Sequence, residues 1–268
     1  MGVGQLLDAS IRLYLRHWKT FIAISALFMV PLAALSALSQ AYLFNEVGAT
    51  PFSDPDAVPT FQDFAGAVGP LAVVGLLSLL ITPLLIGALA WAASKIYLGE
   101  IPAIGEIVSF TFSRFGPLLL ISILTGLAVA GGFLLFIIPG IIFYLRLVFS
   151  PITLVVEDKR GRRALGRSWA LSKGSLGKIF GIVFLTFLIS AIVQAIIGFP
   201  FGAAGAFFLS QGGVGSGSFL GFVGDALAGT LVTPFNTIAL VLLYFDMRIR
   251  KEAFDLTLMA QEIGQQSG

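Results

Sequence analysis

The sequence predicts an all-α integral membrane protein with six transmembrane helices, and three observations carry this prediction. Of the 268 residues, 57% are hydrophobic and only 11% are charged, whereas a soluble domain carries about 25% charged residues. Several long stretches contain no charged residue and are long enough to cross, as helices, a hydrocarbon layer about 30 Å thick. Basic residues gather between alternate stretches, as they do in proteins that cross a membrane several times.

Six apolar segments are predicted to be the spans. The apolar stretch 115–156 is too long for one span, and the Pro139–Gly140 pair predicts an outer turn that divides it. The stretch 179–224 is interrupted at Pro200 and again at the glycine-rich segment SQGGVGSGS, which predicts a flexible outer loop. The predicted spans are residues 20–43, 67–94, 116–138, 141–156, 178–199 and 220–245.

The basic residues predict the orientation of these spans. Fifteen of the sixteen Lys and Arg residues precede span one, lie between spans two and three or four and five, or follow span six. The opposite loops, at about 44–66, 139–140 and 200–219, contain no basic residue. Because basic loops remain on the cytoplasmic side, both termini are predicted to be cytoplasmic, and residues 246–268 form a cytoplasmic tail. The sixteenth basic residue is Arg146, inside span four.

Three short amphipathic segments, at about 3–17, 103–114 and 161–173, each precede a pair of spans. They are predicted to be cytoplasmic interfacial helices, which gives a threefold pattern of a short helix followed by a helical hairpin. The third is predicted to end before Gly174. It is predicted to turn Trp169 inward and its arginines toward lipid phosphates.

The densest group of charges extends from Lys159 to Lys178. One interpretation is a topology anchor that attracts anionic lipid without specificity, and the other is a docking site for a lipid headgroup or an acidic partner. The predicted headgroup or partner contacts are Arg160, Arg162, Arg163, Arg167, Trp169 and Lys173.

Two polar stripes mark spans four and six. At helical spacing, one face of span four would present a stripe that begins at Arg146, and one face of span six a stripe that begins at Asp225. A charge inside a membrane costs at least about 2.5 kcal/mol and so faces the protein interior or water. We therefore predict an Arg146–Asp225 ion pair; the alternatives are snorkelling of Arg146 to outer headgroups and a functional polar cavity between the two spans. The predicted intramembrane site comprises Arg146, Ser150, Thr153, Glu157, Asp225, Thr233 and Asn236.

The composition argues against several kinds of chemistry. The chain has no cysteine, so disulfides and thiolate sites are excluded. The single histidine, His17, lies beside Trp18 in a basic stretch typical of a headgroup-level anchor. No cluster of His and carboxylates has the spacing of a metal site. The segment GRRALGRS, at 161–168, has phosphate-loop spacing but lacks the lysine and the preceding strand. We expect no enzymatic activity, metal, cofactor or nucleic-acid partner.

Several segments, in this order along the chain, resemble the membrane domain of glycerophosphoryl diester phosphodiesterase-type proteins. They read LLDASIRLYLRHWKTF, IPGIIFYLRLVFSPITLVVED, ALGRSWALSKG and YFDMRIRKEAFDL. The resemblance covers about residues 5–258 and implies a multi-span protein of a bacterial or archaeal cell membrane. It does not imply phosphodiesterase activity, because the chain has no counterpart of the soluble domain that carries it in some members. The matching positions are Pro139, Gly140, Arg146, Glu157, Ser168, Trp169, Gly174, Asp246, Arg248, Arg250 and Asp255.

Two functions are compatible with these features. The first is a non-enzymatic membrane protein that handles, transports or senses a lipid or other amphiphile through the polar face between spans four and six. The alternative is a membrane scaffold that anchors a soluble enzyme or envelope complex through the basic loop and the C-terminal tail. The expected partners are membrane lipids and, for the scaffold, a cytoplasmic protein.

Overall fold

A computed structural model describes residues 2–43, 61–212 and 214–266, and helices are the only regular secondary structure within those ranges. The helices are α1 (Val3–Arg16), α2 (Trp18–Tyr42), α3 (Phe61–Tyr97), α4 (Ile104–Ser113), α5 (Phe115–Leu135), α6 (Ile137–Leu147), α7 (Ser150–Glu157), α8 (Arg162–Ser172), α9 (Leu176–Ser210) and α10 (Val214–Gln266). The all-α prediction is confirmed.

Six segments of the described chain are long and apolar enough to cross a membrane. They are Trp18–Tyr42, Val68–Tyr97, Phe115–Leu135, Ile137–Glu157, Leu176–Ser210 and Phe219–Glu252. Their mean hydropathy lies between 1.8 and 2.5, so the protein is a polytopic all-α membrane protein. The short helices α1, α4 and α8 coincide with the three predicted amphipathic segments, and each is followed by two span-length segments. Their placement at the membrane interface stays a prediction.

The chain reverses between α5 and α6 at Phe136, not at Pro139–Gly140 as the sequence predicts. Phe136 is extended, with φ −164° and ψ 160°, and α6 begins at Ile137. Pro139 therefore lies in the first turn of α6, where a missing N–H removes no helical hydrogen bond. Gly140 is needed for a different reason, because a Cβ there would lie 2.4 Å from the Phe133 ring of α5.

The predicted outer loop at 200–219 is also wrong for most of its length. Helix α9 continues through Pro200 to Ser210, and α10 begins at Val214. Apolar residues on both sides favour continued helix, and the glycines serve close packing instead of flexibility. A Cβ on Gly217 would lie 2.8 Å from the carbonyl oxygen of Gly205. In the predicted loop at 44–66, residues 61–66 are helical, and residues 44–60 lie outside the described ranges.

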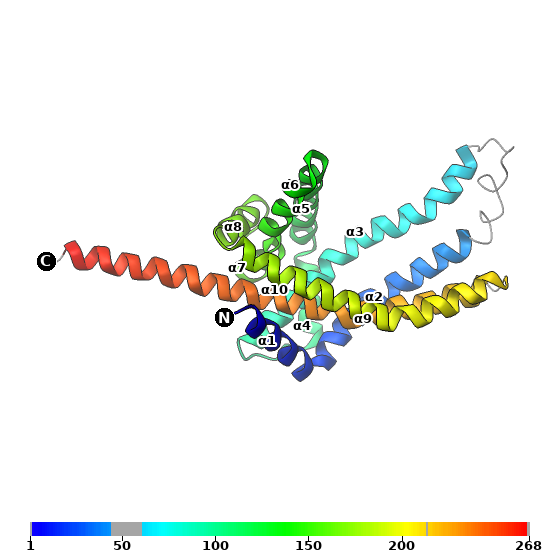
Figure 1. Ribbon diagram of the computed structural model, residues 1–268, viewed down its shortest axis with the longest axis horizontal. Coiled ribbons are helices and arrows are strands. Elements are labelled where there is room, and N and C mark those ends of the chain that lie inside the picture. The colour runs from blue at the N-terminus through cyan, green and yellow to red at the C-terminus, as the bar shows by residue number, and fades with distance from the viewer. Residues whose placement is uncertain (1, 44–60, 213, 267–268) are drawn as a thin grey trace. The chain divides into compact units, whose positions relative to one another are not determined.

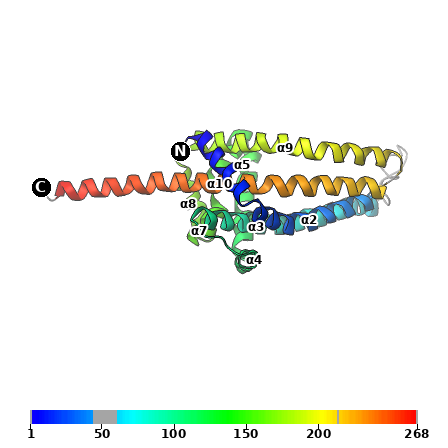
Figure 2. The same ribbon diagram turned by 90° about the horizontal axis from the view of Figure 1, so that it is seen from below.

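The chain forms two compact units. Unit 1 comprises Met1–Trp18, Ile86–Phe187 and Phe235–Gly268, and unit 2 comprises Lys19–Leu85 and Leu188–Pro234. In unit 2, α9 and α10 lie side by side (Figure 2), with Gly224 of α10 against the Phe201 side chain of α9. Gly229 packs on Met29 of α2 in the same unit.

Unit 1 holds the short helices. Its α5 and α6 lie side by side as a hairpin (Figure 1), whose tip from Leu134 to Ile138 exposes every side chain, as a surface facing lipid would. Its interior is closed by the end of α3, the start of α9 and the C-terminal part of α10. The fully buried side chains from those elements include Leu89, Ala92, Ile179, Ile182, Leu243 and Tyr244.

Candidate functional site

Helices α7 and α8 meet in a tight reversal built from two unusual backbone conformations. Asp158, directly after α7, is left-handed with φ 51° and ψ 26°. Asp tolerates this conformation better than most side chains. Gly161, directly before α8, has φ 54° and ψ −130°, a region that favours glycine. The reversal returns α8 against the helices that precede it.

The inner face of α8 is fixed on the break between α6 and α7. Helix α6 ends at Leu147 and α7 begins at Ser150, so backbone groups at the break lack helical partners. The Ser168 hydroxyl donates to the Arg146 carbonyl at 2.7 Å and accepts from the Phe149 N–H at 3.2 Å. Thr153 donates to the Ala164 carbonyl at 3.3 Å. Because Ser168 and Thr153 are fully buried, these bonds give α8 a defined position.

The same break changes the polar stripe predicted along span four. Arg146 lies near the end of α6, whereas the other three residues of the stripe belong to α7. The four side chains therefore do not share one continuous helix. The Arg146 guanidinium lies 4.7 Å from the centroid of the Trp169 ring on α8. Ser150 and Thr153 have no solvent exposure. Within unit 1 the stripe is therefore closed by packing at its centre, and its two charged ends meet different partners.

Glu157, at the end of α7, binds partners from three segments. Both carboxylate oxygens accept from Arg167 Nε at 3.0 Å, and Lys159 Nζ lies 2.7 Å from Oε2. The Tyr244 hydroxyl of α10 also donates to this carboxylate. Only 9% of the Glu157 side chain is exposed, so the carboxylate is stabilised by hydrogen bonds in place of water.

The sequence predicts that Arg167 faces lipid phosphates. In the structure, two carboxylates bind it instead. Besides Glu157, it reaches Glu252 of α10 at 2.5 Å, and Arg248 binds Glu252 at 3.0 Å. Burial acts to lower the pKa of Arg167, but the hydrogen bonds and charges of Glu157 and Glu252 outweigh it and raise that pKa above its usual value.

A second set of contacts connects α10 to α8 and α9. Lys178 of α9 lies 2.6 Å from Asp246, and Arg250 lies 3.1 Å from the same carboxylate. Lys251 Nζ donates to the carbonyls of Ala170 and Lys173 at 2.7 and 2.8 Å. These carbonyls lie at the C-terminal end of α8, where the helix dipole favours a cation. Asp246 and Arg250 have the i,i+4 spacing of a helical ion pair, whereas the spacing of the charges along the chain gives no sign of the contacts of Lys178 and Lys251.

A cavity of about 470 Å³ opens beside the reversal. It is lined by Glu157, Asp158, Lys159, Arg160 and Arg163. Arg160 lies 3.7 Å from Asp158, and both of these side chains are more than half exposed, so their attraction is weak. The lining thus presents three cations and two carboxylates, of which Glu157 is already saturated with donors.

The start of α8 is electrostatically unfavourable as it stands. Its first turn carries Arg162 and Arg163 and no acidic residue, and Gly161 provides no side-chain cap. The positive end of a helix dipole favours anions, and a mismatched charge costs about 0.3–1 kcal/mol. An anion bound in the cavity would offset this cost at Arg163, which lines it.

The remaining predicted residues are placed as follows. Arg162 is exposed on α8, Lys173 is exposed directly after it, and Trp169 is 39% exposed instead of turned inward. Asp225 is exposed and Thr233 half-buried in unit 2, and Asn236 is half-buried in unit 1. Because Arg146 and Asp225 belong to different units, the ion pair between them stays a prediction. Among the residues that the structure describes, no group of three or more His, Asp and Glu could hold a metal ion.

Comparison of the sequence with family models and with curated proteins, and of the fold with solved structures, finds no match. The resemblance to the phosphodiesterase-type membrane domain is therefore neither supported nor contradicted. The geometry at the start of α8 carries the functional argument.

Proposed function

We propose that this integral membrane protein is a non-enzymatic lipid-binding protein that takes the phosphate headgroup of an anionic amphiphile at the start of α8. The observation that carries the proposal is the unneutralised first turn of α8, which opens on a cavity lined by Lys159, Arg160 and Arg163. Helix N-termini bind anions readily because the dipole and the backbone N–H groups act together.

The position of this cavity favours a lipid over a soluble phosphate. It lies at the end of a span-length segment, Ile137–Glu157, so a headgroup and its acyl chains can be accommodated by neighbouring surfaces. The inner face of α8 is fixed by buried hydrogen bonds, which holds the arginines in place before the ligand binds. Such preorganisation reduces the entropy that binding costs.

The test is native mass spectrometry of the purified full chain incubated with equal amounts of phosphatidylglycerol and phosphatidylcholine. We expect preferential retention of phosphatidylglycerol, and an about thirtyfold loss in the R160Q/R163Q variant, because each of the two basic contacts contributes about 1 kcal/mol near the headgroups.

Arg162 provides the matched control for this experiment. It occupies the same helical turn as Arg163 and is exposed, but it does not line the cavity. R162Q should change retention less than about twofold, since only the diffuse attraction of one charge is lost. If R162Q and R163Q weaken binding equally, the cluster is a nonspecific anchor and the proposed site is wrong.

A second candidate function, the scaffold, is favoured by one observation. Helix α10 continues to Gln266, past Glu252 where the last candidate span ends. A helix of this length beyond the span offers a surface for a cytoplasmic protein, although the side chains of Phe254, Leu256, Leu258 and Met259 lie outside the described set. Deleting residues 253–268 should abolish partner recovery in a pull-down from membranes while leaving phosphatidylglycerol retention unchanged.

A further inference from the structure

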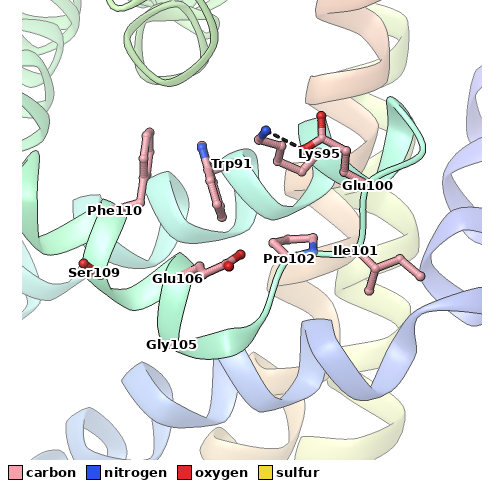
Figure 3. A pocket seen from close by; sticks show the side chains of 9 residues that line it. All are labelled: Trp91, Lys95, Glu100, Ile101, Pro102, Gly105, Glu106, Ser109 and Phe110. Carbon is pink, nitrogen blue, oxygen red and sulfur yellow. Dashed lines mark hydrogen bonds and ion pairs between the residues drawn. The ribbon is translucent and has the colours of Figure 1, made fainter.

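A second cavity in unit 1, of about 630 Å³, lies between the end of α3 and α4 (Figure 3). It is distinct from the cavity at α8, and no predicted site residue lines it. Its lining comprises Trp91, Lys95, Glu100, Ile101, Pro102, Gly105, Glu106, Ser109 and Phe110. We infer that this groove binds the ammonium–phosphate headgroup of a zwitterionic phospholipid that carries a primary amine.

One wall of the groove is a row of aromatic rings and cations. Trp91 and Phe110 stack with their centroids 4.6 Å apart, and Lys95 Nζ lies 5.8 Å from the Trp91 centroid (Figure 3). The Arg114 guanidinium lies 4.3 Å from the centroid of Phe110. The rings therefore already contact each other and the two cations, and a ligand must interact with the polar groups beside them.

Those polar groups carry one excess negative charge. Lys95 pairs with Glu100 at 2.6 Å, but 35% and 61% of these side chains are exposed, so the pair is weak and can exchange partners. Glu106 accepts the Ala103 N–H at 3.3 Å as a helix cap. It has a second carboxylate oxygen, and Figure 3 shows the group pointing into the space below Trp91. A ligand that carries a cation beside an anion would meet the two carboxylates with its cation and Lys95 with its anion.

A headgroup with a primary ammonium next to a phosphate has this charge pattern. Its phosphate would bind Lys95, and its ammonium would donate hydrogen bonds to Glu106 and to the Glu100 carboxylate that Lys95 releases. A primary ammonium has three N–H donors, whereas a quaternary ammonium has none. The carboxylates therefore favour the primary amine over its methylated counterpart.

The surroundings favour a lipid over a soluble amine. Large apolar side chains are exposed around the groove, on the loop before α4 and on α4 itself: Leu98, Ile101, Ile104 and Phe112. Exposed apolar side chains gathered around a polar site are typical of contact with a membrane. Acyl chains can lie against this rim while the headgroup occupies the groove.

The experiment is native mass spectrometry of the full chain with equal amounts of phosphatidylethanolamine, phosphatidylcholine and phosphatidylglycerol of matched acyl chains. We expect phosphatidylethanolamine to be retained about tenfold more than phosphatidylcholine in the wild type, a ratio that corresponds to about one net hydrogen bond to a charged group. E106Q should reduce that retention about tenfold, because it removes the carboxylate that receives the ammonium.

The variant E106Q is specific, because a Gln at the third helical position caps a helix as Glu does. It therefore removes the charge and preserves α4. D8N is the matched control: Asp8 is an exposed carboxylate on α1 that does not line the groove.

R163Q should lower phosphatidylglycerol retention and leave phosphatidylethanolamine retention unchanged. A failure of this inference can therefore be told apart from a failure of the proposed function. Equal retention of phosphatidylcholine, no effect of E106Q, or equal binding of free phosphoethanolamine would each overturn the inference.

Discussion

At the scale of single residues, Glu157 connects α7 to α8 and α10 through its buried carboxylate. It receives hydrogen bonds from Arg167 and from the Tyr244 hydroxyl, and it pairs with Lys159. A carboxylate with so little exposure is stable only while these donors remain, because burial of an unpaired charge is costly. The neighbouring Asp158 is in the opposite situation, since its side chain is 54% exposed.

Replacing Glu157 with Gln should lower the free energy of unfolding by about 2 kcal/mol, because hydrogen bonds to charged groups are lost while Arg167 keeps its charge. Part of the loss is offset by water, since 23% of the Arg167 side chain is exposed. The measurement is thermal or denaturant unfolding of the purified protein in detergent.

The control for this prediction is Asp158→Asn. Asn adopts the left-handed conformation as readily as Asp, and the ion pair of Asp158 with Arg114 at 3.1 Å is exposed on the aspartate side. The change should cost less than about 1 kcal/mol. Equal destabilisation by both variants would show that burial of Glu157 has no energetic consequence.

The sequence identified Glu157 but not its partners. Local spacing placed it at the end of a stripe with Arg146, on the assumption of one continuous helix. The partners Arg167 and Tyr244 are 10 and 87 positions away, and such pairing depends on how the helices pack. The headgroup contact of Arg163 stays a prediction, which its exposure on a short amphipathic helix favours.

At the scale of elements, the α5–α6 hairpin depends on two glycines that allow close approach. A Cβ on Gly132 would lie 2.9 Å from the Gly140 Cα and 2.8 Å from Phe143 Cδ2. The nearest backbone atom cannot move without shifting α6. The hairpin therefore requires glycine where the two helices touch.

Gly132→Ala should destabilise the protein by about 1–3 kcal/mol, the usual cost of overpacking a tight contact. Gly131→Ala is the matched control, because an added Cβ there meets nothing within 4 Å. Alanine has the higher helix propensity, so Gly131→Ala should be neutral or stabilising by up to about 1 kcal/mol. Melting temperatures of both variants in detergent test the pair, and a loss at Gly131 equal to that at Gly132 would contradict it.

The positions of the helices were largely predictable, and their ends were not. Hydropathy summed over about 20 residues depends little on any one residue, so the spans appear clearly. A turn depends on single residues. The Pro139–Gly140 pair is typical of turns, yet Pro is equally tolerated in a first helical turn and Gly140 is used for packing. The glycines near 212–217 were ambiguous for the same reason.

At the scale of the whole molecule, charge is divided between the two units. Unit 1 contains fifteen basic and nine acidic residues, a net charge of +6, and unit 2 contains one basic and five acidic residues, a net charge of −4. The single basic residue of unit 2 is Lys19, at its boundary with unit 1. This segregation is the pattern expected if most basic residues of unit 1 remain on the cytoplasmic side.

The orientation can be tested with single cysteines, because the chain has none of its own. Gln211 lies in the turn between α9 and α10, and Ser113 is exposed at the end of α4. A membrane-impermeant maleimide should label Gln211→Cys in intact cells and Ser113→Cys only after permeabilisation. Labelling of Ser113→Cys in intact cells would contradict the predicted topology.

If the cavity beside α8 and the end of α10 both bind as proposed, the contacts of Glu157 make the two binding events thermodynamically dependent on each other. Glu157 lines that cavity, and its partner Arg167 binds Glu252, beyond which α10 continues toward the proposed partner surface. A ligand that withdraws Lys159 or Arg167 from Glu157 alters the same pairs that hold α10. Such linkage is reciprocal: whatever factor headgroup occupancy applies to partner affinity, the partner must apply to headgroup affinity.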